Sequence, residues 1–280
     1  MRFLFIKILF LLTLLTLLPG CETLKNLQSG DSGSDAEYTG WDAKQFHEKA
    51  RAAMEAGNYQ KAIKLYETLE ARYPFGDYAA QTQLDVAYAY YKNDDPEAAI
   101  AAADRFIKIH PRNPNVDYAY YLRGLVNYNR GIGFLDRFLP TDASQRDPGN
   151  ARNAYDNFAE LIRRFPDSKY VPDAKQRMIA LRNNLAMYEV HVARFYMKRR
   201  AYVAAANRAS HVVQEYQRTP AVPYALQIMR QAYTKLNLTD LAADAERVYK
   251  QNYPDGPPVK ESEGEKTFVE ALWDSIGFDE

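Results

Sequence analysis

The stretch GNYQKAIKLYETLEARYP at residues 57–74 decides the fold of this chain. It opens on Gly57, which allows a sharp turn, and continues as apolar residues at helical spacing that stop before Pro74. Ala62 is small enough for another helix to approach closely, whereas Tyr66 and Leu69 are large enough to fill the space beside it. The stretch therefore predicts a turn followed by one helix that packs against the helix before it.

This pattern matches the second half of a tetratricopeptide repeat, in which two antiparallel helices form a unit that stacks on similar units. The skeleton recurs with equivalent small residues at Ala99, Ala154, Ala205 and Ala242. Helical periodicity runs from Trp41 onward, with almost none of the alternation typical of strands. We therefore predict an all-α protein, a tetratricopeptide-repeat solenoid of about five helix pairs.

Two of the predicted repeats are longer than usual. The small residues are separated by 37, 55, 51 and 37 residues, against about 34 in a standard repeat. The first surplus coincides with a glycine-containing insertion at 130–150 in the third repeat, and the second with a long helix expected from Asp173 to Arg199. N-terminal repeats 1–3 are expected at 41–166 and C-terminal repeats 4–5 at 167–254.

The composition is that of a folded chain without a strong electrostatic field. The chain has 280 residues, of which 47% are hydrophobic and 26% charged, and its 36 basic residues balance 36 acidic ones. These values argue against a disordered or membrane-embedded body and give no basic field that would attract nucleic acid. Binding surfaces must therefore be sought locally.

The first twenty residues differ in kind from the rest. A short basic segment with Arg2 and Lys7 precedes an apolar run at 8–18 that is too short to cross a bilayer. Leu-Pro-Gly-Cys follows directly and resembles the bacterial lipobox, although Pro19 is an unusual occupant of its position. Residues 1–20 are predicted to be a lipoprotein signal peptide.

Cys21 is the only cysteine of the chain. Because it has no partner for a disulfide, acylation explains it better than redox chemistry, the alternative being an incidental cysteine at an ordinary cleavage site. By resemblance to the lipoprotein sorting pattern, Glu22 favours the outer membrane. Residues 21–40 include SGDSGSD and are predicted to be a flexible tether from acylated Cys21. We expect a lipid-anchored protein that faces the periplasm and contacts the membrane only through its anchor.

The chain shows no convergent set of polar groups that would suit catalysis. His47 and Glu48 begin like a zinc-protease helix, but Arg51 stands where the second histidine is needed. The other histidines lie in separate repeats, without ligands at metal-binding spacing: His110, His191 and His211. The chain is predicted not to be an enzyme and to hold neither a cofactor nor a metal.

Aromatic residues gather where the first two repeats meet. Six of them form a candidate groove for an extended substrate peptide: Tyr73, Phe75, Tyr78, Tyr88, Tyr90 and Tyr91. Tyrosine offers a large contact area at a low entropic cost, and stacked helix pairs leave an inner surface suited to binding peptides. The alternative is that most of these rings pack between helices.

Several segments resemble the BamD (ComL) family of lipoproteins, which serve the machinery that inserts β-barrels into the outer membrane. The most specific are RYPFG at 72–76, YAYYKN at 88–93 and DRFI at 104–107, and the resemblance covers the lipobox and most of 42–254. It implies a subunit whose N-terminal repeats bind C-terminal signal strands of unfolded outer-membrane proteins, and whose C-terminal repeats dock the barrel subunit BamA. Other lipoproteins of the complex are further implied partners, and nucleic acid is not.

The same resemblance assigns partner docking to Asn207 and Arg208 in the fourth repeat. An arginine suits such an interface because its planar guanidinium can hold a carboxylate through two hydrogen bonds. We therefore expect Arg208 to lie at the docking surface for BamA.

The segment 255–280 departs from the family pattern. It carries eight acidic residues against two lysines, and a few apolar residues at helical spacing: Phe268, Val269, Leu272, Trp273 and Ile276. We expect an acidic tail with a short amphipathic segment that docks on a partner subunit or on the solenoid itself, the alternative being a solvated tail without a role.

A second class of function stays open at this point. A repeat lipoprotein could instead scaffold or activate cell-wall synthases without handling unfolded substrates. Depletion of the protein separates the two, because the first function predicts a loss of outer-membrane porins and the second a loss of peptidoglycan synthesis.

Overall fold

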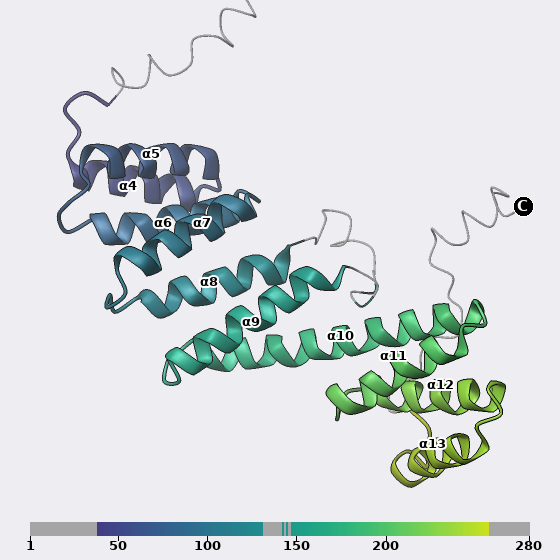
Figure 1. The fold of residues 1–280 in the computed structure, drawn as a ribbon. Coiled ribbons are helices and arrows are strands. Elements are labelled where there is room, and N and C mark those ends of the chain that lie inside the picture. The colour runs from purple at the N-terminus through teal and green to yellow at the C-terminus, as the bar shows by residue number, and fades with distance from the viewer. Residues whose placement is uncertain (1–37, 131–141, 143, 145–146, 258–280) are drawn as a thin grey trace, which may run out of the picture.

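The structure is a computed structural model that describes residues 38–130, 142, 144 and 147–257 (Figure 1). Several sequence predictions fall outside the described residues: the signal peptide at 1–20, acylated Cys21, nearly all of the tether, most of the insertion at 130–150 and the acidic tail beyond residue 257.

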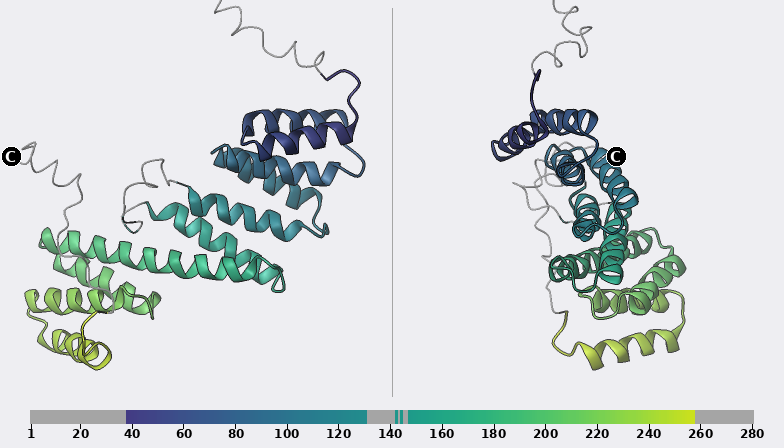
Figure 2. Two further views of the ribbon diagram at one scale, coloured as in Figure 1. Left: turned by 180° about the vertical axis from the view of Figure 1, so that it is seen from behind. Right: turned by 90° about the vertical axis from the view of Figure 1, so that its left-hand side faces the viewer.

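Ten helices in the described part of the chain form five antiparallel pairs, and no strand occurs there. The pairs are α4 (Ala43–Glu55) with α5 (Tyr59–Arg72), α6 (Ala79–Lys92) with α7 (Pro96–Ile109), α8 (Val116–Asn129) with α9 (Pro148–Arg164), α10 (Val171–Lys198) with α11 (Tyr202–Glu215), and α12 (Val222–Lys235) with α13 (Thr239–Asn252). The pairs stack in chain order, so that the first and last lie at opposite ends (Figure 2). The predicted all-α repeat solenoid is confirmed.

Four of the five pairs are joined by the same left-handed turn. The turn residues with positive φ are Gly57 at 74°, Asp94 at 62°, Arg200 at 59° and Asn237 at 60°. The next amide in each turn donates to the carbonyl five residues earlier, as from Asn58 N to Ala53 O at 2.9 Å. This bond satisfies a carbonyl that the end of a helix leaves free. The turn thus stops the first helix and sends the second back along it.

The second helix of each pair ends at a residue whose side chain carries a ring, either aromatic or imidazole. The residues are Tyr73, His110, Phe165, Tyr216 and Tyr253, and each donates its backbone amide to the carbonyl four residues earlier. Their separations of 37, 55, 51 and 37 residues equal those of the small residues that defined the repeats. A ring at this position is therefore part of the repeat architecture.

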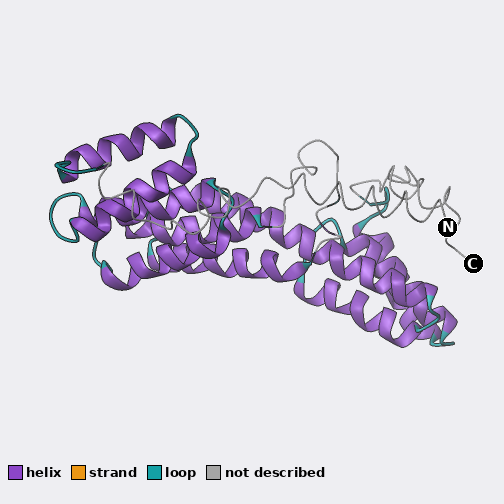
Figure 3. Ribbon diagram, turned by 90° about the horizontal axis from the view of Figure 1, so that it is seen from above, coloured by secondary structure: helices purple, strands orange, loops and turns teal. Residues whose placement is uncertain are grey.

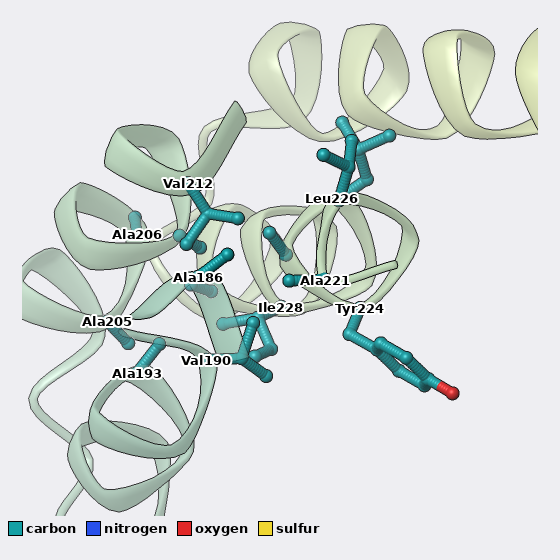
Figure 4. Close-up of a cluster of buried hydrophobic side chains, with 14 residues drawn as sticks. Ala186, Val190, Ala193, Ala205, Ala206, Val212, Ala221, Tyr224, Leu226 and Ile228 are labelled. Atoms are coloured by element: carbon teal, nitrogen blue, oxygen red, sulfur yellow. The ribbon is translucent and has the colours of Figure 1, made fainter. Parts of the chain in front are cut away.

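The core consists of small residues facing larger ones. Ala62, Ala99, Ala154 and Ala205 are fully buried at 0% exposure, whereas the equivalent Ala242 in the last helix is only half-buried. In the fourth repeat, small side chains of α11 lie against α10, as Figure 4 shows for Ala205 beside Ala193, and Val190 of α10 lies beside Ile228 of α12. Close helix packing thus depends on alanine at the contact points.

Helix α10 connects the first three repeats to the last two. It has 28 residues, equivalent to about 42 Å, and packs against α9, α11 and α12. It begins two residues before the predicted start at Asp173 and ends one residue before Arg199. The stack is consequently elongated when seen from above (Figure 3).

One helix contact requires glycine. A Cβ added to Gly124 in α8 would lie 2.6 Å from two ring carbons of Phe158 in α9, whose side chain is fully buried. Glycine in a helix interior normally gives way to alanine with a gain in stability. Here we expect the opposite: Gly124→Ala lowers the free energy of unfolding by about 1–3 kcal/mol, because the Phe158 ring must move.

Urea unfolding of the variants measures this effect. In a Phe158→Leu background the obstacle is removed, so Gly124→Ala should be neutral or stabilising there. A similar loss of stability in both backgrounds would show that the Phe158 ring is not the cause.

Candidate functional site

A cleft lies between the first helices of the first two repeats, α4 and α6. Its volume is about 370 Å³. Its lining comes from α4, α5 and α6: His47, Arg51, Met54, Glu55, Tyr66, Gln81, Asp85 and Tyr88. Apolar, aromatic and charged groups therefore meet in one hollow.

One wall of the cleft is held by an ordered polar pair. His47 Nε2 lies 3.1 Å from Asp85 Oδ2, and Gln81 Nε2 donates to Asp85 Oδ1 at 2.7 Å. Burial, followed by the negative charge of Asp85, raises the pKa of Tyr66. The phenol therefore stays protonated and can donate a hydrogen bond beside the carboxylate.

The other charged groups of the cleft are more exposed. Arg51 Nη2 lies 3.4 Å from Glu55 Oε1, one helical turn away on α4, and both side chains are well exposed. An exposed pair of this kind contributes little to stability. Both groups remain available to a ligand that enters from solvent.

Three of the six predicted groove residues lie at or beside the cleft. Tyr88 lines it and is 36% exposed. The Tyr78 ring is centred 5.1 Å from the imidazole of His47, and the Tyr91 ring 6.0 Å from the Tyr88 ring. The structure therefore brings Tyr78, Tyr88 and Tyr91 into one neighbourhood.

The other three lie elsewhere. Tyr73 ends α5, packs in the core of the first repeat and donates its hydroxyl to Trp41 O at 2.8 Å. Tyr90 is half-buried between the cores of the first two repeats and donates its hydroxyl to Glu67. Phe75 is 89% exposed in the loop after α5 and is not part of the cleft lining.

Sequence reasoning missed the polar half of this site. His47, Arg51 and Met54 recur at spacings of four and three residues on α4, as do Gln81, Asp85 and Tyr88 on α6. This spacing places each trio on one face of its helix. Two such faces on equivalent helices of adjacent repeats are the signal in the sequence that marks this site, and the incomplete metal motif at His47 and Arg51 does not reveal it.

The predicted docking residues Asn207 and Arg208 are both exposed on α11. Arg208 Nη1 donates to Glu189 Oε2 at 3.0 Å, and Arg152 Nη2 lies 3.7 Å from Glu189 Oε1. The Glu189 side chain is only 2% exposed, against 47% for Arg208. Arg208 therefore holds a buried carboxylate of its own chain and still presents part of its guanidinium to solvent.

The described residues contain no group of three or more His, Cys, Asp or Glu residues that could hold a metal ion. No described helix has the length and apolar character needed to cross a membrane.

The comparisons with known proteins agree on one family. Residues 40–248 match the family model YfiO, described as an outer membrane lipoprotein. The outer membrane protein assembly factor BamD of Neisseria meningitidis serogroup B is 46% identical over 256 residues, which cover 91% of this chain and 94% of that relative. BamD of Xylella fastidiosa (strain Temecula1) is 38% identical, with 89% and 83% covered, and BamD of Haemophilus influenzae is 35% identical, with 88% and 90% covered. The chain therefore belongs to the YfiO family of outer membrane lipoproteins, that of the outer membrane protein assembly factor BamD.

Proposed function

We propose that this chain is a non-enzymatic subunit of the β-barrel assembly machinery that receives unfolded outer-membrane proteins in its N-terminal repeats. The cleft between α4 and α6 binds the aromatic-ended C-terminal strands of these substrates. The observation that carries the proposal is the meeting of exposed Tyr88, buried Tyr66 and the His47–Asp85 pair in one hollow. The relatives, which are named as assembly factors, supply the class of process.

The size and chemistry of the cleft suit the end of a chain. A volume of about 370 Å³ is at the lower end of ligand pockets, so it fits one or two side chains and not a whole strand. Tyr88 offers a ring face to an aromatic residue, and Arg51 can attract a terminal carboxylate. The rest of the strand would lie over the neighbouring surface.

The C-terminal repeats, in the same proposal, dock the periplasmic domains of BamA. Arg208 supports this assignment because its exposed guanidinium can pair with a carboxylate of the partner. The chain is anchored in the outer membrane by acylated Cys21 and faces the periplasm, where other lipoproteins of the machinery are further partners. No contact with the membrane beyond the anchor is needed.

Photo-crosslinking of substrate peptides tests the division between the two halves. A peptide copied from the C-terminus of a β-barrel protein, with a photoreactive group beside its last aromatic residue, should crosslink to residues 47–55 and 78–91. A peptide with that aromatic replaced by serine is the matched control and should crosslink weakly. Crosslinks found only beyond residue 170 would contradict the assignment.

Depletion in cells tests the class of function. Loss of outer-membrane porins is the expected result. Loss of peptidoglycan synthesis with porins intact would instead indicate the scaffolding of cell-wall synthases.

A further inference from the structure

Charge is distributed unevenly between two segments near the C-terminus. Residues 190–239 contain eight Lys or Arg residues and a single acidic residue, Glu215, whereas 255–280 contains eight acidic residues and two lysines. The whole chain is neutral, with 36 charges of each sign. A basic part of the folded body is thus followed closely by an acidic tail.

The basic charges are densest at the turn between α10 and α11. Three consecutive exposed residues, Lys198, Arg199 and Arg200, occupy this turn. One exposed apolar residue lies on each side of the turn: Phe195 before it, with 52% of its surface exposed, and Val203 after it, with 60% exposed. We call these five residues the end patch.

The end patch is not neutralised by acidic neighbours in sequence. The nearest acidic residue before it is Glu189, which is buried and already bound to Arg152 and Arg208. The nearest one after it is Glu215, at the far end of α11. Within the patch, the Arg199 guanidinium carbon lies 5.0 Å from the centre of the exposed Phe195 ring. The patch therefore combines positive charge with an aromatic side chain that is about half exposed to solvent.

We propose that the end patch is the docking surface for the acidic tail of the same chain, residues 265–280. In this segment Phe268, Val269, Leu272, Trp273 and Ile276 recur at helical spacing, and its net charge is negative. Its apolar residues cover Phe195 and Val203, and its carboxylates pair with the three basic residues of the turn.

The tail is long enough to reach this surface. From Pro257, the last described residue, to Phe268 there are 11 residues, which span at most about 37 Å. The α10–α11 and α12–α13 turns are equivalent turns of adjacent repeats, and α10 packs against α12, so the two turns lie about 10–20 Å apart. Helix α13 adds about 21 Å along its axis, which places the end patch within about 30 Å of the end of α13.

Tethering favours the tail over other ligands of the patch. A segment joined by a short linker acts at an effective concentration in the millimolar range, so even a weak interaction keeps the patch occupied by the tail. An anionic lipid surface could also attract a basic patch with an exposed ring. The tail is preferred because it is present at every copy of the patch and has the complementary charge.

The test uses the full mature chain with a photoreactive benzoylphenylalanine in place of Trp273. After irradiation, mass spectrometry should find a crosslink within one chain to the peptide that contains Phe195 or Val203, with a yield that does not depend on protein concentration. The double variant Lys198→Glu/Arg199→Glu should lower the ratio of docked to free tail, which the crosslink yield measures, about tenfold. The reason is the loss of two or more ion pairs. The control Lys61→Glu/Lys64→Glu reverses two exposed charges on α5 and should leave the ratio unchanged.

Three results would overturn the proposal. One is a crosslink between two chains whose yield rises with concentration. Another is a crosslink that maps elsewhere or survives the Lys198→Glu/Arg199→Glu change. The third is the lack of any crosslink, and reduced binding of that variant to phosphatidylglycerol vesicles would then assign the patch to a lipid surface.

Discussion

Replacing Arg208 with glutamate is expected to lower the free energy of unfolding by about 3 kcal/mol, because the change leaves a carboxylate buried beside a like charge. Glu189 is 2% exposed, and its Oε2 accepts from Arg208 at 3.0 Å. Arg152, at 3.7 Å, compensates only in part. Urea unfolding measures the loss, and Asn207→Glu, which adds a negative charge at the adjacent exposed position, should change stability by less than about 0.5 kcal/mol.

This structural role must be separated from the proposed docking role. Arg208→Glu is also expected to reduce the recovery of BamA with the tagged chain. Glu189→Gln is the informative comparison, because it removes the internal charge and leaves Arg208 in place. If Arg208 pairs directly with BamA, recovery with Glu189→Gln stays unchanged or rises. If recovery instead follows the stability of each variant, the arginine acts only by holding α10 and α11 together, and unchanged recovery with Arg208→Glu would remove it from the interface.

The repeat pattern could be predicted because it depends on residues close in sequence. A glycine or asparagine at the turn, alanine at the helix contact and a ring at the helix end recur at fixed offsets, and Gly57, Ala62 and Tyr73 illustrate all three. The turn at Arg200 is harder to predict, because a left-handed conformation is uncommon for arginine, whereas the aspartate at position 94 adopts it more readily. At Arg200 the surrounding helix packing imposes the turn.

The charged pairs could not be predicted in the same way. His47 and Asp85 are 38 residues apart, and Glu189 and Arg208 are 19 apart. Their pairing depends on how adjacent helices are aligned, which hydrophobic periodicity does not specify. A glutamate at position 189 has no local feature that marks it as buried, and only the packing of α9 and α11 around α10 encloses it.

The aromatic cluster illustrates the same limit. Tyr88 and Tyr91 are three residues apart on α6 and their rings are in contact, whereas Tyr90 packs against the cores of the first two repeats; Tyr91 also packs against the second of these cores. Helical spacing separates these directions but does not say which one faces a ligand. The opposite wall of the cleft, which α4 supplies, shows that Tyr88 is the tyrosine of α6 that faces the hollow.

Replacing Tyr88 with alanine is expected to weaken the binding of substrate C-terminal peptides about tenfold, as the loss of a central aromatic contact does at many interfaces. The 36% exposure of Tyr88 leaves its ring accessible in the cleft, and Tyr88 belongs to none of the buried clusters of the described core. Fluorescence anisotropy with a labelled peptide measures the affinity. Phe75→Ala is the matched control: it removes an equally large ring that is 89% exposed and outside the cleft, so affinity should change less than about twofold.

The pair of variants decides where the substrate lies because the two rings belong to the same aromatic cluster in sequence and differ only in position. Equal losses for both would mean that the peptide lies over the α5–α6 loop, outside the cleft. A loss with Phe75→Ala alone would exclude the cleft altogether. Asp85→Asn extends the test: it removes the charge that faces His47 at 3.1 Å, so a ligand whose carboxylate enters the cleft should bind more tightly to this variant, whereas one that enters by its aromatic side chain alone should not.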